Sequence, residues 1–77
     1  MAYTEIGKNI QAARIQQNLS REALAERSGL SANFIGNIER GEKAVSLESF
    51  ISIANGLGVS ADVLLGSVLT NGYQVKT

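Results

Sequence analysis

One stretch of the sequence, residues 21–40, limits the fold more than any other, because it predicts two short helices joined by a tight turn. Gly29 lies at the turn, where a positive φ would be costly for a residue with a Cβ. Ile35 and Ile38 are three residues apart, so both point back toward the first helix. Ala25 is small at the place where the two helices must cross closely. The pattern therefore indicates a helix-turn-helix motif.

Three further helices are expected around this motif. The five predicted helices span about residues 5–17, 21–28, 32–40, 47–57 and 61–65, and each follows a short polar residue that can cap it: Thr4, Ser20, Ser31, Ser46 and Ser60. The apolar faces predicted for the first, fourth and fifth helices are Ile6, Ile10 and Ala13; Leu47, Phe50, Ile51, Ala54 and Leu57; and Val63, Leu64 and Leu65. Gly7 either weakens the first helix by up to ~1 kcal/mol or lets another backbone approach it. Short helices with short loops predict one compact all-α domain over residues 1–66.

The last residues, 67–77, have a different pattern. Asn71 and Gly72 stand between two short runs with β propensity, which is a local signal for a hairpin over Val68–Val75. A two-stranded hairpin alone is marginal in water, so it would need the body of the domain or a second chain. A frayed tail, or the start of a longer extension, remains an alternative.

Composition excludes several kinds of protein. The 77 residues include no cysteine and no histidine, so disulfides, thiolate metal sites and histidine catalysis are excluded, and no cofactor is expected. No apolar run approaches the ~20 residues that span a membrane, and the N-terminus does not resemble a signal peptide, so a cytoplasmic location is expected. The formal net charge is zero, which disfavours nucleic-acid binding. However, five of the seven basic residues lie between positions 14 and 43. Four acidic residues, Glu22, Glu26, Glu39 and Glu42, share this region and make any positive face narrow, so weak non-specific binding to DNA is expected.

The motif and its flanks resemble one known family. The Cro/repressor-type (Xre) helix-turn-helix family has its characteristic residues at the positions of Ala25, Gly29, Leu30, Ile35, Ile38, Glu39 and Gly41. The flanks agree, with Arg14 before the motif and residues 46–65 after it, so the resemblance covers residues 5 to 66. It implies a compact five-helix, lambda-repressor-like fold and a bacterial or phage transcriptional regulator that binds double-stranded DNA.

The third helix carries the candidate base contacts. With Ile35 and Ile38 inward, the residues Ala32, Asn33, Gly36 and Asn37 line its other face. An asparagine can pair with the N6 and N7 atoms of adenine, and an alanine can touch a thymine methyl group. The resemblance implies base contacts at these family positions: Ser31, Ala32, Asn33 and Asn37. The alternative is that small and polar residues simply coat a solvated helix face.

Phosphate contacts are expected at two helix N-termini, where free N–H groups and the helix dipole favour anions. One is at Ser20 and Arg21, and the other is at Ser46, with Arg40 and Lys43 in the loop that leads to it. The family resemblance implies such contacts on either side of the third helix. The alternative for the charged side chains is solvated surface charge, and for Lys43 the two interpretations are about equal in weight.

Arg14 and Glu39 have a structural interpretation instead. The resemblance implies a buried ion pair of this kind between the first helix and the end of the third, which would keep both charges away from DNA. The alternative is that Arg14 contacts a phosphate.

One domain of this kind reads half of a site, so a two-fold dimer on a pseudo-palindrome is expected. Apolar residues near the C-terminus are the candidates for the dimer surface: Leu57, Val59, Val63 and Leu65, with Val68 and Leu69 as further candidates. A second hypothesis is a protein-interaction module, either antitoxin-like or the DNA-binding part of a longer regulator, with a partner protein bound through the C-terminal region. An enzyme is disfavoured, because no residues form a nucleophile–base pair or a metal cluster.

Overall fold

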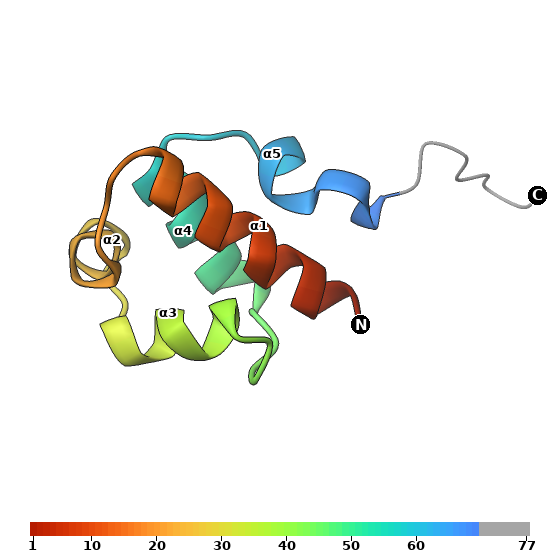
Figure 1. The fold of residues 1–77 in the computed structure, drawn as a ribbon, viewed down its shortest axis with the longest axis horizontal. Coiled ribbons are helices and arrows are strands. Elements are labelled where there is room, and N and C mark those ends of the chain that lie inside the picture. The colour runs from red at the N-terminus through yellow and green to blue at the C-terminus, as the bar shows by residue number, and fades with distance from the viewer. Residues whose placement is uncertain (70–77) are drawn as a thin grey trace, which may run out of the picture.

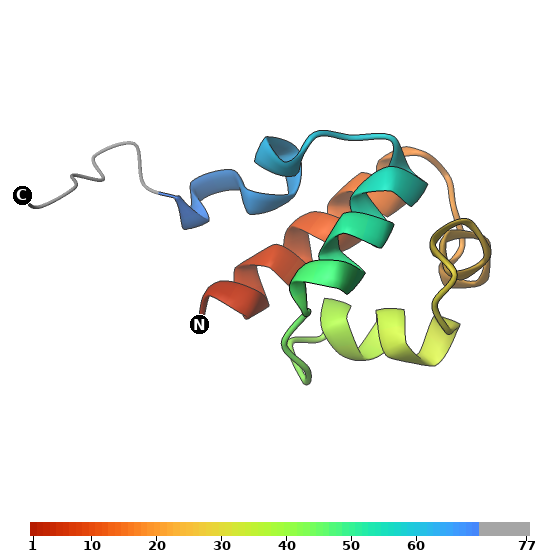
Figure 2. The same ribbon diagram turned by 180° about the vertical axis from the view of Figure 1, so that it is seen from behind.

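The computed structural model describes residues 1–69 and contains the five expected helices. They are α1 (Ala2–Gln16), α2 (Arg21–Ser28), α3 (Ala32–Glu39), α4 (Leu47–Leu57) and α5 (Ala61–Leu65), followed by a 3-10 turn, η1 (Gly66–Val68). Figures 1 and 2 show α1 passing across α4, with α3 on one side of the pair and α5 on the other. The prediction of a compact all-α, five-helix fold is confirmed.

Serine hydroxyls set the beginnings of three helices. The hydroxyl oxygens of Ser20, Ser31 and Ser46 accept hydrogen bonds of 3.0, 3.0 and 3.1 Å from the backbone N–H three residues further on. Each bond satisfies one of the N–H groups that a helix leaves unpaired at its first turn. Ser60 stands at the same position before α5, but its side chain makes no capping bond.

The predicted start of the first helix is wrong. α1 begins at Ala2, so Thr4 lies inside the helix and does not cap it. The backbone N–H of Thr4 bonds to the carbonyl oxygen of Met1 at 3.0 Å. The helix extends to this point because neither glycine nor proline stands in its first turn. The Thr4 side chain instead lies beside Gly41, where a Cβ built on the glycine would be 3.2 Å from Cγ2 of Thr4.

The core lies between all five helices. Nine apolar residues are buried in it: Ile10, Ala13, Leu24, Ala25, Ile35, Ile38, Ile53, Leu57 and Leu64. The fourth helix differs from the prediction, because Ile53 is fully buried while Leu47 and Ile51 are 75% and 50% exposed. Ile51 stands two residues before Ile53, which places it about 200° around the helix, on the opposite face.

Two glycines, Gly29 in the motif and Gly7 in α1, have conformations or neighbours that explain why they lack a side chain. Gly29 ends α2 with φ +72°, in the left-handed region. Gly7 lies where α1 meets the backbone at the end of α3, and a Cβ built on it would overlap the carbonyl group of Ile38. The close approach of a second backbone, one of the two explanations considered for Gly7, is therefore confirmed.

Of the C-terminal segment, residues 67–69 lie within the described part of the chain. Val68, the first residue of the expected hairpin, belongs to the 3-10 turn η1, which continues from α5 and packs against α1. Asn9 of α1 donates a 2.9 Å hydrogen bond to the carbonyl oxygen of Leu64, which holds the end of α5 in place. The Asn71-Gly72 turn lies outside the described residues. Within residues 1–69, no helix is long and apolar enough to cross a membrane.

Candidate nucleic-acid interface

The outer face of α3 carries two asparagines one helical turn apart. Ile35 and Ile38 are fully buried on the inner face, so Asn33 is exposed and Asn37 is half-buried on the other side. The Asn33 side chain makes no hydrogen bond to any other described residue. An amide with both its donor and its acceptor unpaired is suited to pairing with an adenine edge.

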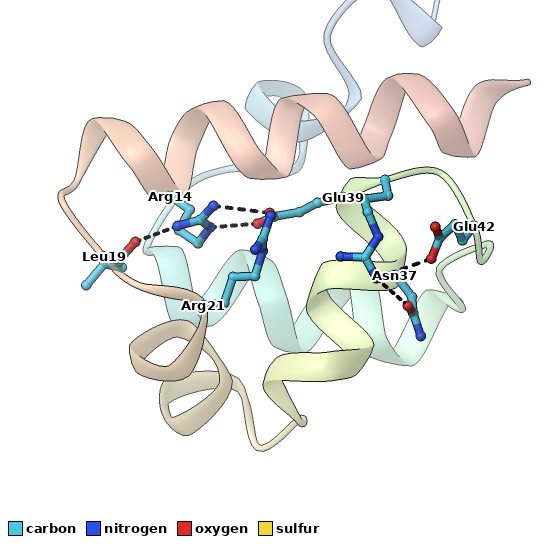
Figure 3. Close-up of polar contacts among 7 residues, drawn as sticks. Arg14, Leu19, Arg21, Asn37, Glu39 and Glu42 are labelled. Carbon is cyan, nitrogen blue, oxygen red and sulfur yellow. Dashed lines mark hydrogen bonds and ion pairs between the residues drawn. The ribbon is translucent and has the colours of Figure 1, made fainter.

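Asn37 differs from Asn33 because it has a partner within the same helix turn. Its Oδ1 atom accepts a 2.7 Å hydrogen bond from the Nη2 atom of Arg40 (Figure 3). The same Nη2 atom lies 3.2 Å from Oε1 of Glu42. Arg40, expected on a phosphate, is therefore engaged by two neighbours, although its side chain remains exposed.

Gly36 does not lie open on the outer face, as the sequence suggested, but is buried. Two arginine side chains cover it: a Cβ at this position would lie 3.0 Å from Nη1 of Arg40 and 3.7 Å from Cδ of Arg21. The missing side chain at Gly36 leaves room for these arginines rather than for a DNA strand.

At the start of α3, Ser31 and Ala32 already make contacts within the domain. The hydroxyl oxygen of Ser31 accepts the capping bond from Phe34, so its O–H and its second lone pair remain for other partners. Ala32 is half-buried and packs against the core, which leaves part of its methyl group exposed.

Behind α3 lies a buried network of three charges. The Glu39 carboxylate accepts bonds from Nε and Nη2 of Arg14 at 2.7 and 3.1 Å, and from Nε of Arg21 at 2.9 Å (Figure 3). The Arg14 Nη1 atom also donates a 2.8 Å bond to the carbonyl oxygen of Leu19. The pair that the family resemblance implied is thus present, and it joins α1 to the end of α3.

The third member of this network was not expected. The sequence indicates only a phosphate contact for Arg21, yet its Nε donates to the carboxylate of Glu39, 18 residues further along the chain. Its side chain remains 38% exposed, so its outer N–H groups stay accessible. The network of Arg14, Arg21 and Glu39 has a net charge of +1. Its exposed part is the Arg21 side chain, beside the start of α2.

The other candidate phosphate contacts differ in whether their polar groups already have partners within the domain. The hydroxyl oxygens of Ser20 and Ser46 serve as helix caps, and the first N–H groups of α2 and α4 lie beside them. Lys43 is exposed in the loop between α3 and α4, and no carboxylate among residues 1–69 pairs with it. Among residues 1–69, no group of acidic, histidine or cysteine residues could hold a metal ion.

This arrangement, a half-exposed helix held by a capped turn against a second helix, is that of a helix-turn-helix DNA-binding domain. The chain belongs to the helix-turn-helix family HTH_3, whose model matches residues 10–64. The family consists of transcriptional regulators and not of enzymes, and the chain is accordingly a DNA-binding transcriptional regulator.

Named relatives agree with this assignment. Control protein C.SmaI of Serratia marcescens is 42% identical over 60 residues, which cover 78% of this chain and 71% of the relative. The immunity repressor protein of Bacillus phage phi105 is 31% identical over 61 residues, 79% of this chain and 42% of the repressor. The chain thus spans most of one relative and less than half of the other.

Solved structures confirm the lambda-repressor-like fold. The clp gene regulator ClgR from C. glutamicum superimposes with a TM-score of 0.82 at 29% identity, covering 96% of this chain and 97% of that structure. The restriction-modification controller protein C.AhdI from Aeromonas hydrophila gives a TM-score of 0.77 at 32% identity, covering 80% and 94%.

Proposed function

We propose that this regulator reads a specific double-stranded DNA sequence by placing α3 in the major groove. The observation that carries the proposal is the division of α3 into two faces. Ile35 and Ile38 hold its inner face in the core, while Asn33 stands on the outer face and its amide bonds to no other described residue. A helix held in this way can enter the groove without losing packing.

Base contacts are assigned to the outer face and the beginning of α3. Asn33 and Asn37 provide the amides, the Ser31 O–H is a donor, and the exposed part of the Ala32 methyl group can touch a thymine methyl. Each good amide–base pair contributes about 1–3 kcal/mol of discrimination.

Phosphate contacts are assigned to both sides of α3. The first N–H groups of α2 and α4, beside Ser20 and Ser46, favour anions through the helix dipole, and Arg21 and Lys43 add exposed charge. Arg40 is a further cation in this region. If each half of a dimer uses about three cations, the logarithm of the binding constant should fall with the logarithm of salt concentration with a slope of about −5.

A two-fold dimer on a pseudo-palindromic operator completes the proposal, because one domain covers only half a site. Two of the candidate interface residues, Val63 and Leu69, are 51% and 62% exposed. Leu57 is buried in the core of its own chain, so it is not part of the proposed dimer surface. If a partner protein rather than a second copy covers this surface, the purified chain will remain a monomer when it is concentrated.

The test is selection of bound duplexes from a random DNA pool at about 50 mM salt, where phosphate contacts are strong. Wild type should enrich an inverted repeat whose half-site centres lie about 34 Å apart. Asn33→Ala should weaken the base preference at one or two positions of each half-site, and such positions are called blurred below. Asn55→Ala is the matched control, because Asn55 is an exposed asparagine on α4. Enrichment of no sequence by the wild type would contradict the proposal.

A further inference from the structure

We propose that Arg40 orients Asn37 so that the Asn37 amide reads guanine, whereas Asn33, whose amide bonds to no other described residue, reads adenine. This inference rests on the proposed function, because it assigns the specificity of one base pair within the same site. It makes Arg40 a positioning residue for base readout rather than a phosphate contact.

The first step is the orientation of the Asn37 amide. A guanidinium group donates hydrogen bonds and has no acceptor, so the atom of Asn37 that faces Arg40 must be the oxygen. The observed bond, 2.7 Å from Nη2 to Oδ1, has this polarity. The amide nitrogen of Asn37 therefore points away from the dashed bond drawn in Figure 3, where it can donate to a base.

The second step is that Arg40 itself is held. Its Nη2 atom lies 3.2 Å from Oε1 of Glu42, so an anion balances the guanidinium on the side of the loop. Its Nη1 atom lies over Gly36, where a Cβ would approach it to 3.0 Å. The absence of a side chain at Gly36 gives Arg40 a path across α3 to Asn37.

The two purine edges in the major groove differ in the hydrogen-bonding groups that they present. Adenine presents one acceptor, N7, and one donor, N6–H₂, whereas guanine presents two acceptors, N7 and O6. A free asparagine matches adenine because its oxygen accepts from N6 while its nitrogen donates to N7. The Asn37 oxygen already accepts from Arg40, and the adjacent guanidinium carries only donors and a positive charge. With its oxygen turned toward Arg40, Asn37 presents its N–H₂ donors to the groove, and these match the two acceptors of guanine.

Asn33 provides the contrast within the same helix. It lies one turn before Asn37, it is exposed, and it bonds to no other described residue. Its amide can rotate to present both the oxygen and the nitrogen. Two residues of the same type on one helix face are therefore expected to read different bases.

The experiment measures relative affinities for duplexes that carry each of the four bases at the position blurred by Asn37→Ala. Wild type should prefer guanine there. Arg40→Met should lower the guanine-to-adenine affinity ratio about tenfold at that base pair alone, the size of one good amide–base pair. In the Asn37→Ala background, the same Arg40→Met substitution should leave the ratio unchanged, because the amide that Arg40 orients is absent.

Lys43→Met is the matched control, since it removes one exposed cation from the adjacent loop. It should weaken binding to all four duplexes equally and reduce the salt slope by about 1, as loss of a phosphate contact does. If Arg40→Met behaves in the same way, Arg40 is a phosphate contact and the inference is wrong. A wild-type preference for adenine at this position would also overturn it.

The inference and the proposed function fail in different ways. If the pool yields no enriched duplex, both are lost. If the pool yields an inverted repeat that Asn33→Ala blurs, while Arg40→Met leaves every base preference unchanged, the proposed function stands and only the inference is overturned. Circular dichroism of Arg40→Met should match that of wild type, because the Arg40 side chain is 48% exposed.

Discussion

Glu39 binds two arginine side chains that come from different helices, and its own side chain is completely buried. A buried carboxylate of this kind is stable only while its partners remain, because each charge has lost its hydration. Arg14 depends on Glu39 in the same way, because Arg14 is also nearly buried and has no other anion beside it among the described residues. The network therefore makes the end of α3 sensitive to single substitutions.

Glu39→Ala should lower the free energy of unfolding by about 3 kcal/mol, since it leaves the Arg14 charge buried without its partner. Glu39→Gln should cost less, because the amide oxygen still accepts one of the bonds. Urea denaturation followed by circular dichroism measures both. Glu26→Ala, at an exposed position of α2, should change the free energy of unfolding by no more than about 0.5 kcal/mol. An equally small change for Glu39→Ala would show that the network does not stabilise the fold.

These contacts were only partly predictable from the sequence. The Arg14–Glu39 pair followed from the family resemblance and not from spacing, because 25 residues separate the two. The bond from Arg21 to Glu39 had no sequence signal at all, since it depends on how α2 crosses α3. The Asn37–Arg40 bond was accessible in principle, because side chains three residues apart on a helix are neighbours.

Among the helices, Gly7 and Gly36 show how the same residue type can have opposite roles. Both lie inside helices, where replacement of glycine by alanine normally stabilises by up to ~1 kcal/mol. At Gly7 the neighbour is the Ile38 backbone, which cannot move without separating α1 from α3. At Gly36 the nearest neighbour is the flexible end of Arg40.

Gly7→Ala should therefore lower the melting temperature of the domain, whereas Gly36→Ala should leave it unchanged or raise it by a few degrees. The comparison of the two variants by thermal denaturation is its own control, because the chemical change is identical. A rise in melting temperature for Gly7→Ala would mean that α1 and α3 are not in backbone contact.

Helix positions were well predicted where a local signal existed. Ser20, Ser31 and Ser46 begin helices by capping, and Gly29 and Gly58 end them with a positive φ, as the residue types require. The faces of α4 were harder to assign, because its sequence contains apolar residues all around the helix. Only the packing against α1 and α2 decides that Ile53 is buried and Ile51 is exposed.

Across the whole molecule, the small core leaves several large apolar side chains in contact with water. Val63 on α5 and Ile15 on α1 are similar in this respect, with 51% and 56% of their surface exposed. Only Val63 belongs to the surface assigned to the dimer. The pair therefore allows the proposed interface to be tested without disturbing the core.

Val63→Lys should weaken self-association by at least about tenfold, because it places a charge in an apolar contact without a partner. Sedimentation equilibrium over a range of protein concentrations measures the effect. Ile15→Lys should leave self-association unchanged. If both variants associate like wild type, the dimer surface lies elsewhere.

The central claim, that α3 reads bases through Asn33, is tested most directly by a double-mutant cycle between protein and DNA. Wild type and Asn33→Ala are each titrated against the selected duplex and against the same duplex with the blurred base pair replaced. The account predicts that the two changes are strongly non-additive, with a coupling of about 1–3 kcal/mol, because each removes the same contact. Additive losses would contradict it, since they would mean that Asn33 contributes to binding without contacting that base.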